Sequence, residues 1–215
     1  MPDKIRIEKN SVQEMLLIPL YSRVQCTRLY PEIYSDPLSE EALNRIDYPF
    51  KETVKKDSMM VRFGALEAAM RQYDVKEEVR GYLKEHPGAA VVNLGCGLDP
   101  LTKYLDNGTC RLYNIDLPDV IEIRNEIFPA GKAALKMMIK SVVKNSAGIE
   151  GVDAYFHAGR PKKDIVPWIG DAKVAYKGYM LGYSDLRIPG VSDMFRLLSK
   201  IGDGPMKMKI VKIGF

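Results

Sequence analysis

Ala89-Ala-Val-Val-Asn-Leu-Gly-Cys-Gly-Leu-Asp99 is the stretch that decides the fold of this chain. A short apolar run leads into a Gly-x-Gly turn, and Asp99 followed by Pro100 has the residue types of a helix N-terminus. Glycines at 95 and 97 permit a sharp turn and a close approach of the backbone to a ligand. The stretch therefore predicts a strand, a turn and a helix that together can hold a nucleoside.

A second apolar run, Leu112-Tyr-Asn-Ile-Asp116, ends in a carboxylate. At a strand's C-terminal end, Asp116 can accept hydrogen bonds from two ribose hydroxyls, each contributing about 1.5–3 kcal/mol. The alternative is a tight turn without a ligand and an ordinary solvated acid. We expect strands over 89–95 and 110–116, and helices over 99–106 and 118–127.

Pro100 stands where the dinucleotide fingerprint Gly-x-Gly-x-x-Gly has its third glycine. That glycine allows close helix–strand packing and leaves the helix N-terminus open to pyrophosphate, which Asp99 would repel. An acid instead attracts an ammonium group. S-adenosylmethionine, which has an ammonium and a sulfonium and no phosphate, is therefore the predicted cofactor. A NAD-linked oxidoreductase is the weaker alternative.

The motifs Val91–Asp99 and Tyr113–Ile121, with Arg124 close behind, resemble the leucine carboxyl methyltransferase family. The closer branch contains the tetracenomycin polyketide O-methyltransferases. Further similar segments are Leu20–Arg23, Tyr34–Pro37, Arg71–Asp74, Val79–Leu83, Val152–Phe156, Lys177–Tyr183 and Met206–Ile213. The resemblance implies a class I methyltransferase fold, S-adenosylmethionine as methyl donor, and an acceptor oxygen in a carboxyl or hydroxyl group of a small molecule or peptide end.

The chain departs from the family after the second expected strand. Relatives continue through three more strand–helix units, whereas here Phe128–Gly131 passes directly into a helix-like run at Ala133–Lys140. We therefore expect an α/β fold with an incomplete Rossmann-like sheet and an internal deletion near 130–133. The loss would remove the wall beside the methyl group and leave the first strand with a free edge. A non-catalytic remnant or cofactor-binding module is thus the alternative to an active enzyme, and the edge can invite a homo-oligomer.

The candidate cofactor-binding residues lie in the turn, at the second strand's end and on two earlier helices. They are Gly95, Cys96, Gly97, Asp99, Asp116, Leu117, Arg71 and Arg23. Either guanidinium can hold a carboxylate of the cofactor in a two-pronged contact, and the alternative is that each is a surface helix arginine. No catalytic residue is identified.

Residues 1–88 are expected to form a helical cap, and 89–215 the Rossmann-like core. Capping boxes at Ser11–Glu14 and Asp74–Glu77 each predict a helix start, and Pro19 should kink or restart the first helix. The other expected elements are a short helix from Asp36-Pro37, a helix over 58–73, a helix over 131–146, strands over 153–157 and 172–178, a helix near 190–200 and a strand over 206–213.

Composition narrows the class of protein. The chain has 215 residues, 46% hydrophobic and 28% charged, as in ordinary globular proteins. Neither a signal peptide nor an 18-residue apolar run is recognisable, so we expect a cytoplasmic protein that does not bind membranes. Its three cysteines should be reduced thiols, and no Cys or His pair has metal-ligand spacing. Lysines spread along expected helix faces, without interleaved aromatic residues, argue against nucleic-acid binding.

Overall fold

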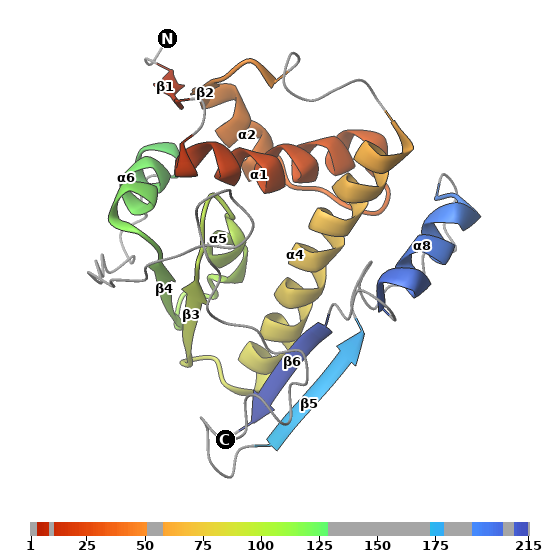
Figure 1. The fold of residues 1–215 in the computed structure, drawn as a ribbon. Helices are drawn as coiled ribbons and strands as arrows, with labels where there is room; N and C mark the ends of the chain where they lie inside the picture. Colours follow the sequence, from red (N-terminus) through yellow and green to blue (C-terminus); the bar gives the residue numbers. More distant parts are fainter. Residues whose placement is uncertain are drawn as a thin grey trace. The chain divides into compact units, whose positions relative to one another are not determined.

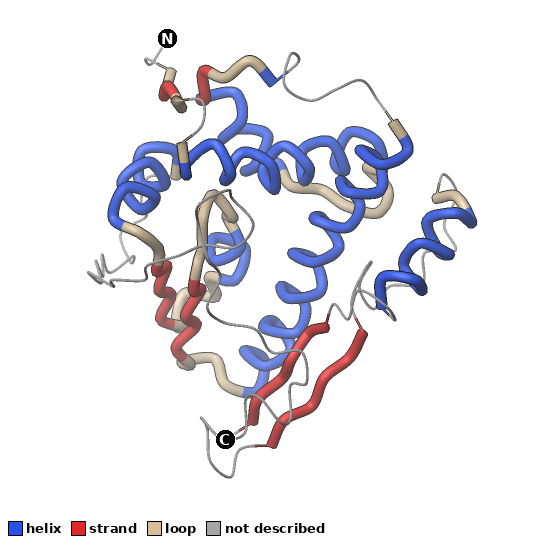
Figure 2. The backbone as a smooth tube through the Cα atoms, viewed as in Figure 1, coloured by secondary structure: helices blue, strands red, loops and turns tan. Residues whose placement is uncertain are grey.

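The computed structural model describes residues 4–8, 11–50, 58–128, 173–178, 191–203 and 209–214 (Figure 1). The chain forms two compact units, Met1–Lys140 and Ser141–Phe215, and each is described by itself. The boundary between cap and core that the sequence predicts at residues 88 and 89 stays a prediction. Within the first unit, helices and two short strands precede a longer pair of strands (Figure 2).

The first unit opens with β1 (Ile5–Arg6) and the helix α1 (Val12–Leu29). Ser11 is the N-cap that the sequence predicts, and its hydroxyl accepts from the amide of Glu14 at 3.2 Å. The helix continues through Pro19, so this proline does not end or restart it.

The next helix is α2 (Pro37–Arg45), followed by β2 (Ile46–Asp47), which pairs with β1 in parallel. Asp36 is its predicted N-cap, and the carboxylate accepts from the amide of Ser39 at 3.0 Å.

The helix α4 (Met59–Glu85) corrects the expectation of two helices that meet at residue 74. Asp74 is buried inside one continuous 27-residue helix instead of capping a new one. The part of α4 after Asp74 packs against the short helix and the strand pair that follow it in the chain, where Val79 and Leu83 join one apolar cluster, and this tertiary contact overrides the local capping pattern. The helix ends just before Pro87 and Gly88, as the sequence predicts.

The strand pair that carries the turn consists of β3 (Ala90–Leu94) and β4 (Arg111–Ile115), joined by α5 (Leu101–Leu105). The strands run parallel and pair from Ala90 with Arg111 to Leu94 with Ile115. After β4 the chain enters α6 (Pro118–Ile127). The strands predicted over 89–95 and 110–116 and the helix over 118–127 are confirmed, whereas the helix over 99–106 is shorter than predicted.

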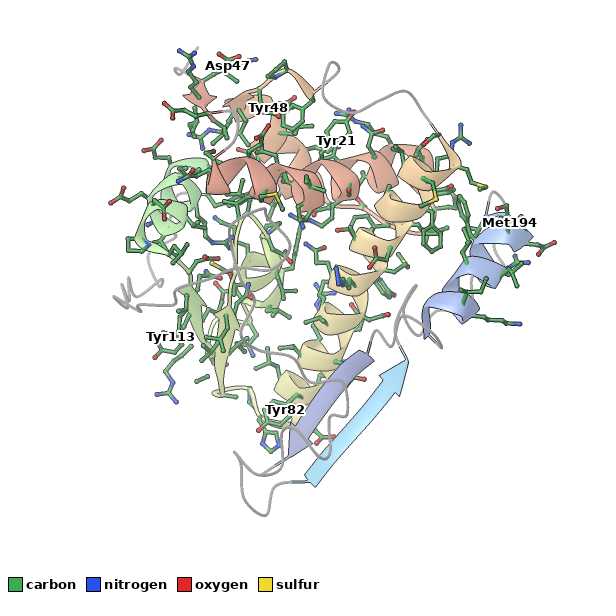
Figure 3. The ribbon with its side chains drawn as sticks, viewed as in Figure 1. Tyr21, Asp47, Tyr48, Tyr82, Tyr113 and Met194 are labelled. Atoms are coloured by element: carbon green, nitrogen blue, oxygen red, sulfur yellow. The ribbon has the colours of Figure 1, made fainter. Side chains whose placement is uncertain are left out.

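The two faces of this sheet differ. One face packs in an apolar cluster made by Leu83, Leu101, Leu105, Val91 and Leu112. On the other face Val92 is 50% exposed and Leu94 is 73% exposed. Tyr113, the partner of Val92 in β4, extends from the sheet on the side away from α4 in Figure 3.

The described residues give β3 a single strand neighbour, β4. The first unit is therefore a mixed α/β structure with short parallel strand pairs, which is compatible with the predicted fold class. A larger Rossmann-like sheet, and the pairing of the free edge with a second copy, stay predictions.

A second apolar cluster connects the cap helices to the turn. Its buried members are Ile7, Leu17, Leu20, Ala42, Ile46, Leu98, Ile127 and Phe128. Leu98 belongs to the turn, and Ile127 and Phe128 lie at the end of α6. This cluster therefore fixes the turn between α1, α2 and α6.

The second unit contains β5 (Lys173–Gly178), α8 (Asp193–Asp203) and β6 (Lys209–Gly214), and the two strands pair antiparallel. The strand predicted over 172–178 and the helix near 190–200 are confirmed. The strand predicted over 206–213 is confirmed from Lys209 onward, and residues 206–208 lie outside the described residues. The expected helix over 131–146 and strand over 153–157 lie outside the described residues. In the described part of the chain, no helix combines the length and apolar character needed to cross a membrane.

Candidate cofactor site

The turn after β3 depends on its two glycines. Gly95 and Gly97 have φ angles of 64° and 46°, in the left-handed region that side chains disfavour. The amides of Gly95 and Cys96 both donate to the carbonyl of Ile115, at 2.8 and 3.3 Å. The turn is therefore anchored to the end of β4, where Asp116 follows.

Asp116 faces the turn, as the sequence predicts for a strand-end acid. Its Oδ2 accepts from the amide of Gly97 at 2.7 Å, and its Oδ1 accepts from the amide of Leu117 at 2.8 Å. A carboxylate has about four acceptor positions, so these two bonds leave room for two more. The side chain is half-buried and remains open to a ligand.

Asp99 lies at the start of α5, but the helix begins later than predicted. Pro100 occupies the N-cap position, and Asp99 instead accepts from the amide of Leu101 at 2.9 Å with its Oδ1. The same oxygen accepts from Nε2 of Gln72 at 2.6 Å. Asp99 is thus tied both to its own helix and to the cap helix α4.

Arg23 reaches the turn from α1. Its Nη2 donates to the carbonyl of Leu98 at 2.9 Å, and its Nε lies 3.2 Å from Oδ2 of Asp36. Both charged side chains are buried. Because the guanidinium already binds a carboxylate and a carbonyl, its contacts are those of an anchor for the turn.

Asp36 is the acceptor at the centre of this polar cluster. Besides Arg23, it accepts from the hydroxyls of Ser39 at 2.6 Å, Tyr104 at 2.6 Å and Tyr34 at 3.1 Å. Burial alone would raise the pKa of Asp36, but the hydrogen bonds from Ser39 and Tyr104 and the charge of Arg23 outweigh it and lower that pKa. Asp36 therefore stays ionised at neutral pH.

Burial and the neighbouring carboxylate raise the pKa of both Tyr34 and Tyr104 well above the ordinary tyrosine value. Both hydroxyls consequently stay protonated. Tyr104 donates to Asp36, and the single proton of Tyr34 is shared between Asp36 and the closer Oε1 of Gln72.

Arg124 holds the turn from the other side, on α6. Its Nη1 donates to the carbonyl of Gly97 at 2.7 Å, and its guanidinium lies 5.3 Å from the ring centroid of Phe128. The side chain is buried, which lowers its pKa. Burial also raises the pKa of the Cys96 thiol to about 11, so Cys96 is protonated at neutral pH and is no thiolate nucleophile.

The structure brings together most of the predicted site residues. Gly95, Cys96, Gly97, Asp99, Asp116 and Leu117 form one turn and strand end, and Arg23 contacts it. Arg71 lies apart from them: its side chain is 51% exposed and pairs with Glu67 at 3.7 Å on the same helix. The cofactor-binding role of each residue stays a prediction.

Sequence reasoning missed the roles of three residues that contact the turn or its partners. Gln72 and Arg124 bond directly to the turn, and Asp36 bonds to Arg23 and Gln72. All three lie in or beside segments that carried the family resemblance, and this was the available signal. In the described ranges, no group of three or more His, Cys, Asp or Glu side chains is arranged to hold a metal ion.

Comparison with known proteins identifies two relatives. The chain is 36% identical over 132 residues to the tetracenomycin polyketide synthesis O-methyltransferase TcmP of Streptomyces glaucescens, which covers 60% of this chain and 46% of TcmP. It is 30% identical over 132 residues to the S-adenosyl-L-methionine-dependent methyltransferase dpfgK of Gibberella zeae, covering 58% of this chain and 44% of the relative.

The chain thus spans somewhat less than half the length of each relative. No family model matches the sequence, and no solved structure matches it. Over the aligned residues, the resemblance to the tetracenomycin polyketide O-methyltransferase branch that the motifs predicted is confirmed.

Proposed function

We propose that the turn 95–99 and Asp116 bind S-adenosylmethionine, and that the chain supplies the cofactor-binding part of an O-methyltransferase. The carboxylate of Asp116 carries this proposal. It lies 2.7 Å from the amide of Gly97, is half-buried at the end of β4, and keeps acceptor positions for two ribose hydroxyls.

The charges around the turn support a cationic cofactor. Asp99 and Asp116 place two carboxylates beside it, while both nearby guanidiniums are buried and donate to backbone carbonyls. Two acids would repel a pyrophosphate and attract an ammonium or sulfonium group. The printed name of the relative from Gibberella zeae states a dependence on S-adenosyl-L-methionine, which agrees with this choice over NAD.

The proposed reaction moves the methyl group from the sulfonium to an acceptor oxygen, in a carboxyl or hydroxyl group of a small molecule or peptide end. Such a transfer requires close in-line placement of the acceptor. The TcmP relative is named as an O-methyltransferase, which supports oxygen as the acceptor atom. No residue of this chain is assigned to the acceptor.

A cofactor-binding module without catalysis is the second candidate. The two-stranded sheet favours it, because the described residues give β3 only one neighbour and leave one apolar face exposed. The described residues do not include the part of a parallel sheet that would form the wall of the site beside the methyl group and its acceptor.

Isothermal titration calorimetry of the full chain with S-adenosylmethionine tests the proposal. Asp116→Ala should weaken binding about tenfold or more, because it removes hydrogen bonds to a charged acceptor. Glu122→Ala, which removes an exposed acid on α6, is the matched control and should leave binding unchanged. Binding of NAD without binding of S-adenosylmethionine would overturn the proposal.

An assay for S-adenosylhomocysteine release separates the two candidates. Release in the presence of carboxylic acids or phenols indicates an enzyme. Cofactor binding without release across such a panel indicates a module.

A further inference from the structure

Gln72 connects the two carboxylates on the cap side of the turn. Its Nε2 donates to Oδ1 of Asp99 at 2.6 Å and makes a longer contact of 3.4 Å with Oδ2 of Asp36. Its Oε1 accepts from the hydroxyl of Tyr34 at 2.5 Å. A carboxamide offers two N–H donors and one carbonyl acceptor, so a single orientation of the buried side chain satisfies all three contacts.

This arrangement determines which oxygen of Asp99 is occupied. Oδ1 accepts from Gln72 and from the amide of Leu101. Among the residues that the structure describes, no hydrogen bond reaches Oδ2. The half-buried carboxylate is therefore held through one oxygen, and the other is left to accept from a ligand.

The position of Gln72 is defined independently of any ligand. Tyr34 and Asp36 are both buried, and Asp36 is fixed in turn by Arg23, at 3.2 Å. The chain of contacts runs from α1 and α2 through Gln72 on α4 to Asp99. A change at Gln72 would release Asp99 without breaking the ion pair behind it.

We propose that Gln72 is a positioning residue that orients Asp99 to accept the ammonium group at the amino-acid end of S-adenosylmethionine. This inference rests on the proposed cofactor site. It assigns the two ends of the cofactor to different acids: Asp116 takes the ribose and Asp99, held by Gln72, takes the ammonium. Gln72 does not itself touch the cofactor.

The two assignments can be separated with two ligands. S-adenosylhomocysteine has both the nucleoside and the amino-acid end, whereas 5′-methylthioadenosine has the nucleoside alone. Gln72→Met preserves length and burial but removes the donors, so we expect about tenfold weaker binding of S-adenosylhomocysteine and less than twofold change for 5′-methylthioadenosine. Gln25→Met, a half-buried glutamine on α1, is the control and should change neither.

A double-mutant cycle shows whether Gln72 acts through Asp99. Asp99→Asn should weaken S-adenosylhomocysteine as Gln72→Met does, and the double variant should bind no worse than Asp99→Asn alone. Additive losses, or equal losses for both ligands, overturn the inference because they indicate a general structural role. If Gln72→Met does not fold, Gln72→Asn, which is too short to span both acids, provides the same comparison.

Failure of the proposed function gives a different result. In that case the unmodified chain binds neither ligand, and the assignment of Gln72 is overturned together with the site. If the unmodified chain binds both ligands equally well, the cofactor site stands and only the assignment of Asp99 and Gln72 fails.

Discussion

The turn after β3 is held by a buried arginine on each side, and the two sides differ in how the charge is balanced. On the cap side, Arg23 lies 3.2 Å from the carboxylate of Asp36 and donates to the carbonyl of Leu98. On the strand side, Arg124 donates to the carbonyl of Gly97 and stands over the ring of Phe128. Among the described residues, no carboxylate forms an ion pair with Arg124.

This difference distinguishes the contacts that stabilise the fold from the contacts that remain available to a ligand. The cap side is a saturated cluster in which every bond of Asp36 goes to protein groups. The strand side keeps acceptor positions on Asp116. We therefore expect substitutions of Arg23 and Asp36 to affect mainly stability, and a substitution of Asp116 to cost less stability and more binding.

Arg23→Met should have the largest effect on stability. It leaves Asp36 buried without its counter-ion, and breaking a buried pair in this way costs about 3–5 kcal/mol of the free energy of unfolding. Urea denaturation of the full chain measures it. Arg28→Met, which breaks an exposed pair with Glu40, is the control and should cost less than about 1 kcal/mol. Equal losses for the two variants would mean that the cap-side cluster is not an anchor.

Arg124→Met should cost less than Arg23→Met, about 1.5–3 kcal/mol. It removes one charge-assisted hydrogen bond, to the carbonyl of Gly97, and leaves no buried carboxylate without its ion-pair partner. The same urea titration gives the value. A loss larger than that of Arg23→Met would reverse the comparison and make the strand side the principal anchor of the turn.

The local elements around the turn were predictable from sequence because their signals are local. Short apolar runs and the glycines at 95 and 97 define the strands and the turn within a few residues. The orientation of Asp116 toward the turn follows from parallel pairing of β3 with β4. Asp99 and Pro100 predicted the cofactor class, and the resemblance implied the same cofactor.

The partners of the turn were not predictable, because they join residues far apart in the chain. Gln72 and Asp99 are 27 residues apart, and Arg23 and Leu98 are 75 apart. The prediction chose Arg71 on α4, yet consecutive helix residues point about 100° apart, so Gln72 faces the turn and Arg71 does not. The apparent capping box at Asp74 failed for a related reason, since contacts of Val79 and Leu83 with residues distant in the sequence stabilise α4 beyond this position.

Acid should weaken the cap side through Asp36. The pKa of this carboxylate is lowered from 3.8 in the folded chain, so the unfolded chain binds the proton more readily. The stabilisation is present at neutral pH and is lost as the pH falls below about 4 toward the folded pKa. Urea titrations between pH 7 and pH 3 should show a declining free energy of unfolding. Asp36→Asn should make that decline shallower, and an unchanged slope would contradict the assignment.

The smallest effect on the free energy of unfolding is expected on the exposed face of β3, the strand that leads into the turn. Val92→Thr replaces a methyl group by a hydroxyl at a half-exposed position and should change the free energy of unfolding by no more than about 0.5 kcal/mol. Val91→Thr makes the same change on the face packed against Leu83 and Leu101, where burial of the hydroxyl should cost about 1 kcal/mol or more. Equal losses would mean that this outer face is also covered in solution. If the Val92→Thr loss grew with protein concentration, the cover would be a second copy of the chain, because stabilisation by association increases with the concentration of the partner copy.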